Sequence, residues 1–281
     1  MQRRQGLKLS IVTINYNDCD GLARTIKSVV GQTCRSFEYI VIDGASTDGS
    51  LDVIRQFEDN LDYFVSEPDT GIYQAMNKGI DQAGGEYLLF MNSGDTFHTP
   101  DVVEQVLPLL QGLDFYGGAI EIQTVPREVR RPPREVTFEY MREKSLYHQA
   151  TFIKTSMLKV RPYNETFRII SDWEQMFYEL IIHNATYQRI DMIIADFAPS
   201  GISANKENWL AMGKAMYEVV QTLTPQRLLA AIDGSGLIEG KIIYAVNHKK
   251  GFKRFVKILR NALKLLIRDL IGRNASEEDF S

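Results

Sequence analysis

"FEYIVIDGASTDGSLDVIRQFEDN", residues 37–60, runs from a short apolar stretch through a polar turn into a segment whose apolar residues lie three or four positions apart. The first part has the pattern of a buried strand and the last part that of an amphipathic helix. The same patterns recur around it, with strands predicted at residues 7–14, 37–43, 61–67 and 86–92. Strands that alternate with helices at this spacing predict right-handed crossovers and a mostly parallel central sheet.

The chain beyond this region carries further strand and helix patterns. A helix is predicted at residues 99–111, where Pro100 suits a first helical turn. The patterns that follow predict strands at 113–125 and 186–197, a Pro- and Arg-rich loop at 125–138 and a helix at 171–184. Only helical patterns occur from residue 205. We therefore expect an α/β domain over residues 1–204 and a C-terminal helical region over 205–281.

The composition is that of an ordinary globular protein. Of 281 residues, 44% are hydrophobic and 24% are charged. The two cysteines, Cys19 and Cys34, do not make a disulfide framework, and the N-terminal residues lack the pattern of a signal peptide. No apolar stretch approaches the roughly 18 residues that a membrane crossing needs. We expect a cytoplasmic protein.

The net charge of -4 conceals a basic segment near the C-terminus. Residues 249–273 contain nine Lys or Arg and one acid, Asp269. On a helical projection of residues 251–272 the apolar and basic side chains fall on separate faces. Such a helix suits an anionic membrane surface, although its apolar face can equally pack on the catalytic domain. No aromatic series or reader motif accompanies it, so we expect no nucleic-acid partner.

Polar residues at the strand ends indicate the chemistry. The sequence has no GxGxxG after its first strand and no GxxxxGK[ST], which disfavours a dinucleotide-dependent dehydrogenase and a P-loop enzyme. Polar side chains instead follow each of the four strands: Thr13, Asn15, Asn17, Asp43, Glu67, Asp69, Asn92 and Asp95. Carboxyl ends of parallel strands meet at one edge of a sheet, where α/β proteins bind ligands. An acidic edge repels a diphosphate unless a divalent cation neutralises it.

Four stretches in this order carry a family resemblance: "SIVTINYN", "YIVIDGASTDGS", "EPDTGIYQAMNKGI" and "GGEYLLFMNSGD". They resemble the nucleotide-sugar-binding half of the inverting glycosyltransferases of family 2, particularly the bacterial cell-surface polysaccharide type. The later "YHQATFI", "SDWEQ" and "SGIS" are similar to acceptor-side motifs of that group. The resemblance covers residues 7 to 203. It implies a GT-A (Rossmann-like) fold, with a donor half over about 1–112 and an acceptor half over 113–204.

The resemblance also assigns the residues that bind the donor. It places Thr13 and Asn15 at the nucleotide edge and Asp43 against the nucleobase. Asp69 is a candidate ligand contact, with a helix cap before the "IYQAMNKGI" segment as the alternative. Asn77 lies inside that helix, where asparagine is mildly unfavourable, and is a candidate contact to the diphosphate or ribose.

The stretch "NSGD", residues 92–95, stands where the family has an acidic cluster that holds a metal against the diphosphate. Asn92 occupies the first acidic position, and only Asp95 keeps a carboxylate. One carboxylate can still hold Mg²⁺ or Mn²⁺ together with phosphate oxygens and waters. The alternative is that Gly94 and Asp95 only turn the chain. The departure leaves metal dependence open.

Inverting transfer needs a carboxylate that takes the proton of the acceptor hydroxyl. The resemblance assigns this role to Asp172, with Glu174 as the lesser candidate. An aspartate there also suits a helix N-terminus on dipole grounds alone. His148 is a candidate contact to the diphosphate or the metal, and Trp173 either packs under a sugar ring or belongs to the core.

The expected function is transfer of a sugar, with inversion, from a nucleoside diphosphate donor to a glycan or lipid-linked acceptor. A carboxylate at Asp43 can serve uracil or guanine, and uracil is the commoner case in the resembling group. Two alternatives stay open: a non-catalytic nucleotide-sugar-binding protein and a sugar nucleotidyltransferase. The second is expected to have a basic, glycine-rich loop after the first strand, and "TINYNDCDG" has neither Lys nor Arg.

Overall fold

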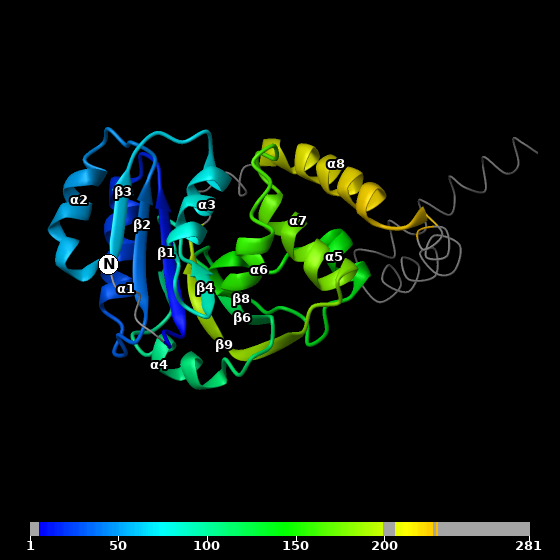
Figure 1. The fold of residues 1–281 in the computed structure, drawn as a ribbon, viewed down its shortest axis with the longest axis horizontal. Coiled ribbons are helices and arrows are strands. Elements are labelled where there is room, and N and C mark those ends of the chain that lie inside the picture. Colours follow the sequence, from blue (N-terminus) through cyan, green and yellow to red (C-terminus); the bar gives the residue numbers. More distant parts are fainter. Residues whose placement is uncertain (1–5, 199–205, 227–228, 230–281) are drawn as a thin grey trace, which may run out of the picture. The chain divides into compact units, whose positions relative to one another are not determined.

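The computed structural model describes residues 6–198, 206–226 and 229 (Figure 1). The chain divides into two compact units, Met1–Leu223 and Thr224–Ser281. The basic helix predicted at 251–272 and the "SGIS" motif at 200–203 lie outside the described residues. None of the helices in the described ranges combines the length and the apolar character that a membrane crossing requires.

The first part of the chain forms the predicted alternation of strands and helices (Figure 1). Its strands are β1 (Leu9–Asn15), β2 (Glu38–Asp43), β3 (Tyr63–Ser66) and β4 (Tyr87–Phe90). The segments between them are α1 (Cys19–Val30), α2 (Ser50–Gln56), η1 (Glu58–Asn60) and α3 (Ile72–Gln82). The four strands pair in the order β3-β2-β1-β4 and are all parallel, which confirms the prediction for this half.

Both faces of β1 are covered, as its apolar pattern predicts. Leu9 and Ile11 belong to the large core cluster that also contains Leu22 of α1. On the other face α3 lies so close that a Cβ at Gly79 would be 2.4 Å from Cγ1 of Val12. Glycine is therefore required for this helix to pack on the strand. All seven β1 residues are buried, and the strand ends at the edge where the polar residues begin.

The second part of the sheet is mixed rather than parallel. It consists of β5 (Thr96–Phe97), β6 (Phe115–Ile122), β7 (Glu128–Arg130), β8 (Thr151–Lys154) and β9 (Tyr187–Phe197). The order continues β4-β8-β6-β9-β5, and β7 pairs with β6. β8 runs antiparallel to both β4 and β6, whereas β6 and β9 are parallel. The prediction of a mostly parallel sheet therefore holds for the first half only.

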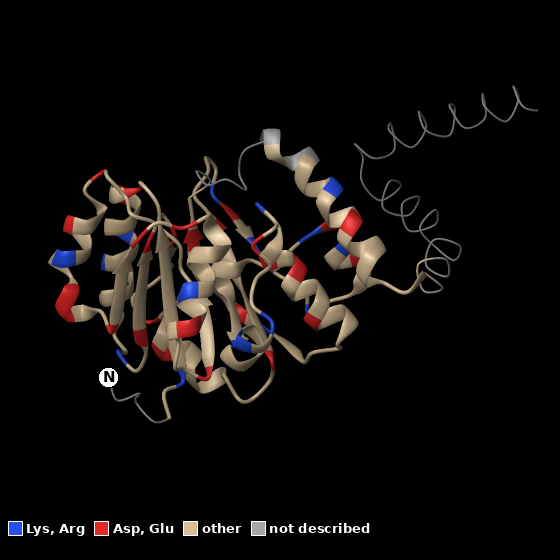
Figure 2. Cartoon of the chain, turned by 45° about the horizontal axis from the view of Figure 1, so that its top comes forward, with Lys and Arg blue, Asp and Glu red and all other residues tan. Residues whose placement is uncertain are grey.

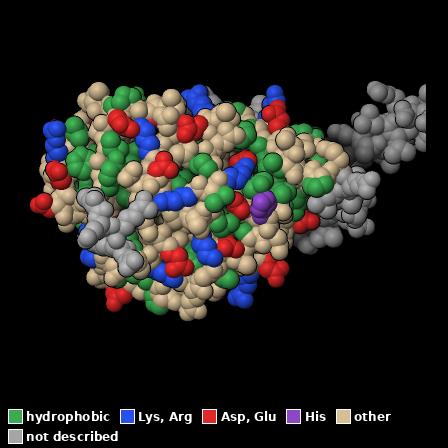
Figure 3. Space-filling view, viewed as in Figure 1, with side chains coloured by type: hydrophobic (Ala, Val, Ile, Leu, Met, Phe, Trp, Pro, Cys, Tyr) green, Lys and Arg blue, Asp and Glu red, His purple; other side chains and the backbone are tan. Residues whose placement is uncertain are grey.

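Most helices of the second part are short, and the last has 18 residues. They are α4 (Val102–Val106), η2 (Leu107–Leu109), α5 (Phe138–Glu143), η3 (His148–Ala150), α6 (Thr155–Val160), α7 (Ser171–Phe177), the π-turn η4 (Tyr178–Ile182) and α8 (Lys206–Leu223). Charged side chains of both signs are interspersed on the face that Figure 3 shows.

Two local predictions need correction. The helix predicted from Thr99 begins at Val102, because the Thr99 hydroxyl bonds to the Asp101 carboxylate at 2.5 Å and the chain turns there first. The Pro- and Arg-rich stretch predicted as a loop contains β7, which adds an antiparallel strand to β6.

Candidate active site

The carboxyl ends of β1, β2 and β3 are tied together by side-chain hydrogen bonds. Asn15 donates to Oδ1 of Asp43 at 2.7 Å, and Ser66 donates to Oδ2 of Asp43 at 2.6 Å. Ser46, in the turn after β2, donates to Asp43 through its hydroxyl at 2.6 Å and its amide at 3.0 Å. Figure 2 shows acidic residues along this edge of the sheet. The structure therefore brings the first three strand ends together.

Asp43 is fully buried at the centre of this network. Burial alone would raise the pKa of its carboxyl, but the bonds from Ser46, Ser66 and Asn15 outweigh burial and hold the pKa below its usual value. Asp43 is therefore an anion with four protein donors. A nucleobase N–H would have to share an oxygen that already accepts a protein hydrogen bond, and the predicted nucleobase contact stays a prediction.

An exposed aromatic side chain stands beside this network. Tyr16 follows β1 directly and is 68% exposed. A Cβ at Gly44 would lie 3.1 Å from the Tyr16 ring and 2.6 Å from Oδ2 of Asp69, so Tyr16 and Asp69 flank the backbone of Gly44. Oδ1 of Asp69 accepts the amide of Gly71 at 3.0 Å in a turn before α3, but Gly71 is the N-cap of that helix and no side chain caps it, so the cap alternative is wrong. The sequence analysis missed Tyr16, and the signal was an aromatic residue inside a polar strand end.

Thr13 does not reach the nucleotide edge predicted for it. Its side chain is fully buried, its hydroxyl donates to the carbonyl of Met91 at 2.7 Å and lies 3.0 Å from the Tyr39 hydroxyl. The physical reason is position, because Thr13 lies two residues before the end of β1 and is still inside the sheet.

Asn77 likewise has a different role from the predicted diphosphate contact. Its amide nitrogen donates to the carbonyl of Tyr163 and to Glu165, both at 2.9 Å, and its amide oxygen accepts the Tyr163 amide at 2.9 Å. Both ends of the side chain are therefore used in holding the segment between α6 and α7 against α3.

The "NSGD" stretch forms a tightly held turn after β4. Gly94 has φ of 95°, a conformation that favours glycine. Thr25 of α1 accepts the Gly94 amide at 3.0 Å and donates to the carbonyl of Asp95 at 2.7 Å. Ser93 donates to Oδ1 of Asn15 at 2.8 Å, which joins this turn to the end of β1. The turn thus holds Asp95 in a fixed place next to the strand ends.

Asp95 and Asn92 have the properties of cation ligands. Burial raises the pKa of the Asp95 carboxyl to about 7, against the opposing effect of His148. Oδ1 of Asn92 is buried and, within the described ranges, has no hydrogen-bond partner. A buried carboxylate and an unpartnered amide oxygen suit a hard divalent cation, which prefers oxygen ligands. The residues present therefore fit the cation that the family resemblance implies.

His148 links the donor half of the site to the acceptor half. Its Nε2 lies 3.2 Å from Nδ2 of Asn92 and 3.9 Å from Oδ2 of Asp95, and its Nδ1 lies 3.4 Å from Oδ2 of Asp172. Burial alone would lower the pKa of His148, but the carboxylates of Asp172 and Asp95 outweigh it and raise the pKa. The histidine thus lies between Asp95 and Asp172, and both carboxyl groups favour its protonated form.

Asp172 is the second residue of α7 and its carboxylate is stabilised from several sides. Oδ1 accepts the Tyr73 hydroxyl of α3 at 2.8 Å. Burial alone would raise the pKa of Asp172, but hydrogen bonds from His148 and Tyr73 and from the Trp173 amide hold it below its usual value. Asp172 is therefore ionised at neutral pH, as a general base must be.

The neighbours of Asp172 on α7 face elsewhere. Glu174 is buried in an ion pair with Arg161, which leaves it in a structural role. Trp173 is also buried, donates to the carbonyl of Met141 at 2.8 Å and stacks on Phe177. The core alternative for Trp173 is therefore the one that the structure supports.

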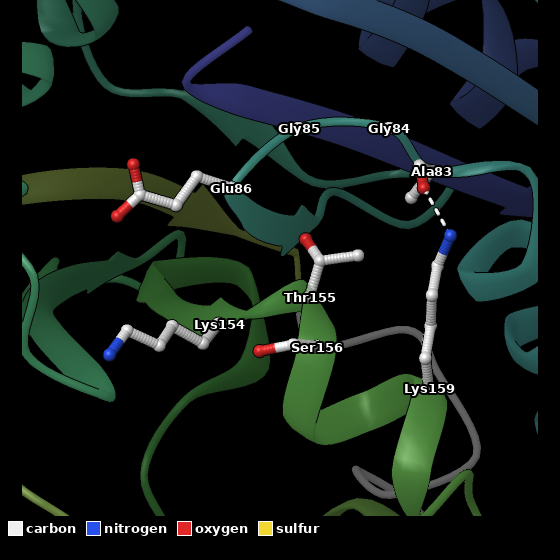
Figure 4. A pocket seen from close by; sticks show the side chains of 8 residues that line it. All are labelled: Ala83, Gly84, Gly85, Glu86, Lys154, Thr155, Ser156 and Lys159. Atoms are coloured by element: carbon white, nitrogen blue, oxygen red, sulfur yellow. Dashed lines mark hydrogen bonds between the residues drawn. The ribbon is translucent and has the colours of Figure 1, made fainter. Parts of the chain in front are cut away.

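Two other features contain polar or charged side chains. A pocket of about 380 Å³ at the opposite end of β4 lies between Gly84, Gly85 and α6, and Lys159 donates across it to the carbonyl of Ala83 at 2.6 Å (Figure 4). His98, Glu121 and Asp196 place ligand atoms within 4.8 Å of one another. Nδ1 of His98 lies 2.7 Å from Oδ1 of Asp196, and Oε2 of Glu121 pairs with the guanidinium of Arg127 at 3.0 Å. Neither group contains a residue predicted for the site.

The comparisons with known proteins agree with this geometry. The model of the family described as "Glycosyl transferase family 2" matches residues 10–171. The chain belongs to this family. An uncharacterized glycosyltransferase of Mycobacterium tuberculosis is 34% identical over 206 residues, which cover 71% of this chain and 78% of the relative. A PGL/p-HBAD biosynthesis glycosyltransferase of Mycobacterium bovis is 27% identical over 185 residues, covering 59% and 66%.

Solved glycosyltransferases share the fold. Residues 1–349 of TarS from S. aureus, in complex with UDP, superpose with a TM-score of 0.58 at 21% identity, covering 68% of this chain and 60% of that chain. The mannosyltransferase PcManGT from Pyrobaculum calidifontis, in complex with GDP-Man and Mn²⁺, gives a TM-score of 0.55 at 15% identity, covering 73% and 59%. The predicted GT-A fold is therefore confirmed, and this family 2 protein is a glycosyltransferase.

Proposed function

We propose that the protein transfers a sugar from a nucleoside diphosphate donor, preferably a UDP-sugar, to a glycan or lipid-linked acceptor with inversion. One observation carries the proposal: His148 lies 3.4 Å from Asp172 and 3.9 Å from Asp95. Asp95, which suits the donor's cation, and Asp172, which suits the acceptor's proton, therefore both lie within 3.9 Å of the same histidine ring.

The reaction divides between the two halves of the site. The acceptor hydroxyl oxygen attacks the anomeric carbon, the bond from that carbon to the β-phosphate oxygen breaks, and the nucleoside diphosphate leaves. Asp172, which its lowered pKa keeps ionised, takes the proton of the acceptor hydroxyl. The neighbouring aspartates raise the pKa of His148 and so favour its protonated form, which would place positive charge close to the site of the leaving diphosphate.

The donor contacts come from the strand ends. Tyr16 offers an exposed ring for stacking on the nucleobase, and Asp69 lies on the other side of Gly44 with Oδ2 able to accept base or ribose donors. Asp43 would have to share an oxygen that already accepts a protein hydrogen bond. Asp95, with the amide oxygen of Asn92, would hold a divalent cation, Mn²⁺ or Mg²⁺. Such a cation neutralises diphosphate charge when it is bound.

Three related proteins support the choice of donor and of pathway class. TarS was solved with UDP, PcManGT with GDP-Man and Mn²⁺, and one relative is named for PGL/p-HBAD biosynthesis. A cell-surface glycan is accordingly the acceptor class that we favour. Peripheral binding to an anionic membrane face through residues 251–272 belongs to the same proposal, and vesicle co-sedimentation of the chain cut after Asn247 tests it, since unchanged binding would contradict it.

The experiment that tests the activity measures nucleotide release from UDP-glucose, UDP-N-acetylglucosamine and GDP-mannose with Mn²⁺, Mg²⁺ or excess chelator. Water or added glycans serve as acceptors, and NMR records the anomeric configuration of the first product. The proposal expects cation-dependent release from a UDP-sugar and an inverted product. A product with retained configuration would contradict it.

The reduced acidic motif favours one alternative, a non-catalytic nucleotide-sugar-binding protein, because only Asp95 carries a carboxylate in residues 92–95. Tight donor binding without nucleotide release from any of the three donors would support that alternative. The nucleotidyltransferase alternative is set aside, because the chain belongs to glycosyltransferase family 2.

A further inference from the structure

Tyr73 is a buried residue of α3 that lies next to the candidate base. It is 5% exposed, and its hydroxyl donates to Oδ1 of Asp172 at 2.8 Å across 99 positions of sequence. It belongs to none of the strand ends that form the donor site. Its only polar atom is therefore committed to a residue of the acceptor half.

The direction of this hydrogen bond is fixed by the surroundings. Asp172 is ionised and has no proton to donate, so its Oδ1 can only accept. Burial and the neighbouring Asp172 charge raise the pKa of Tyr73 well above its usual value, so the phenol keeps its proton. The phenol therefore donates its single proton to Oδ1 of the carboxylate.

We propose that Tyr73 is a positioning residue for the reaction: its hydroxyl holds Oδ1 of Asp172, so that Oδ2, which faces Nδ1 of His148 at 3.4 Å, keeps a lone pair for the acceptor hydroxyl. The inference rests on the proposed role of Asp172 as general base. A carboxylate with one oxygen fixed has one way to face the acceptor, and loss of the Tyr73 hydroxyl would let it rotate.

The chain offers a matched control in Tyr163. The two rings pack with centroids 5.7 Å apart, and both tyrosines are buried near Asp172. Yet the Tyr163 hydroxyl has no hydrogen-bond partner among the residues that the structure describes. Tyr73→Phe and Tyr163→Phe thus remove the same atom from adjacent rings, and only the first removes a bond to Asp172.

The turnover test compares the two variants in UDP release from UDP-N-acetylglucosamine with water as acceptor, which loses its proton to the same base. Tyr73→Phe is expected to lower kcat by roughly 10- to 100-fold, because a hydrogen bond to a charged group is lost. KM for the donor should stay within about twofold. Tyr163→Phe should match the unmodified protein. An unchanged kcat in Tyr73→Phe, or equal losses in both variants, would overturn the inference.

A second measurement needs no turnover. Groups facing the Asp172 carboxylate are Tyr73 from α3, His148 from η3, the Trp173 amide from its own helix and the Tyr163 ring. In protein with ¹³C-labelled aspartate, the Asp172 carboxyl should titrate roughly one pH unit higher in Tyr73→Phe, because the anion loses a donor. Tyr163→Phe should leave the midpoint in place. An unshifted midpoint in Tyr73→Phe would overturn the inference.

Failure of the inference and failure of the proposed function give different results. If Asp172→Asn abolishes UDP release while Tyr73→Phe matches the unmodified protein, the positioning role is wrong and the base assignment stands. If Asp172→Asn releases UDP at the unmodified rate, the base assignment itself is wrong, and the ¹³C titration still reports whether Tyr73 holds the carboxylate.

Discussion

Asp95 and Asp172 approach the same histidine from two regions that are built differently. Asp95 sits in a turn after β4, held by Thr25 of α1 and joined through Ser93 to the end of β1. Parallel strands and their backbone bonds fix this region. Asp172 instead depends on single side-chain contacts, from Tyr73 at 2.8 Å and from His148 at 3.4 Å.

This difference suggests that donor binding and sugar transfer depend on different residues. Substitutions in the donor half should change donor affinity, because its polar residues stand on a rigid sheet edge. Substitutions around Asp172 should change turnover while donor affinity stays the same. Substitutions in each half test whether donor affinity and turnover can be changed separately.

The largest effect is expected for Asp172→Asn. Removing the base should lower the rate of nucleotide release by roughly 10²- to 10⁴-fold, since general base catalysis contributes this much. UDP affinity, measured by calorimetry, should stay unchanged. Glu174→Gln, two residues along α7, should lose thermal stability rather than turnover, because Glu174 pairs with Arg161. Full activity of Asp172→Asn would contradict the role of Asp172 as general base.

Asp95→Asn should act mainly on binding. Losing the carboxylate should weaken UDP binding in Mn²⁺ by roughly 100-fold, because a charge-assisted contact is lost. The remaining affinity should be close to that of the unmodified protein in chelator. Asp101→Asn, in the same segment, is the control, since Asp101 bonds to Thr99 and Gln105. If Asp95→Asn binds UDP as tightly as the unmodified protein does, both with and without Mn²⁺, Asp95 does not hold the cation.

The same carboxylate predicts a pH dependence. Burial raises the pKa of Asp95 to about 7 without a cation. Below that pH the carboxyl must lose a proton before it can bind Mn²⁺, so affinity for UDP with Mn²⁺ should rise by roughly tenfold between pH 6 and pH 8. Calorimetry at three pH values measures this, and Asp95→Asn should flatten the profile. A falling affinity over this range would contradict the assignment.

Tyr16→Ala should have a smaller effect on the same equilibrium. Stacking of an aromatic side chain on a base is worth about 1–3 kcal/mol, so UDP affinity should fall by roughly tenfold. Tyr16→Phe keeps the ring and should bind as the unmodified protein does. Because Tyr16 is 68% exposed, folding stability should be the same in both variants. Unchanged affinity in Tyr16→Ala would remove Tyr16 from the donor site.

The smallest effect on ligand binding is expected for Asn77→Ala. Its side chain makes three bonds at 2.9 Å to the segment between α6 and α7, so the variant should lose roughly 1–3 kcal/mol of stability. UDP affinity should not change. Asp81→Ala, on the exposed face of the same helix, is the control for thermal unfolding. Weaker UDP binding at unchanged stability would restore the diphosphate contact predicted from sequence.

The donor half could be predicted from sequence because its signals are local and repeated. Apolar runs of strand length alternate with helical patterns, and the polar residues that end β2 and β4 stand at the sheet edge as predicted. The predictions for Thr13 and Asn77 were wrong because a strand pattern does not show where the strand ends and a helix pattern does not show what the helix packs against. Thr13 is two positions inside β1, and the direction of the Asn77 side chain depends on how α3 packs.

The acceptor half could be predicted only in part. β5 has two residues, which is too short for a period to show, and the pairing of β5 and β8 is set by strands distant in sequence. Asp172 and His148 were found through motifs of the resembling family. Tyr73 was missed because nothing in a helical pattern reveals that one of its buried residues bonds to a carboxylate 99 positions away.

The most direct test of the central claim, that the ends of β1 to β4 form a nucleotide-sugar site with a cation at Asp95, is calorimetric titration with UDP and with GDP. Each nucleotide is titrated in Mn²⁺, in Mg²⁺ and in excess chelator. The account predicts one UDP site per chain and an affinity at least tenfold weaker in chelator. No binding of either nucleotide in any condition would contradict it.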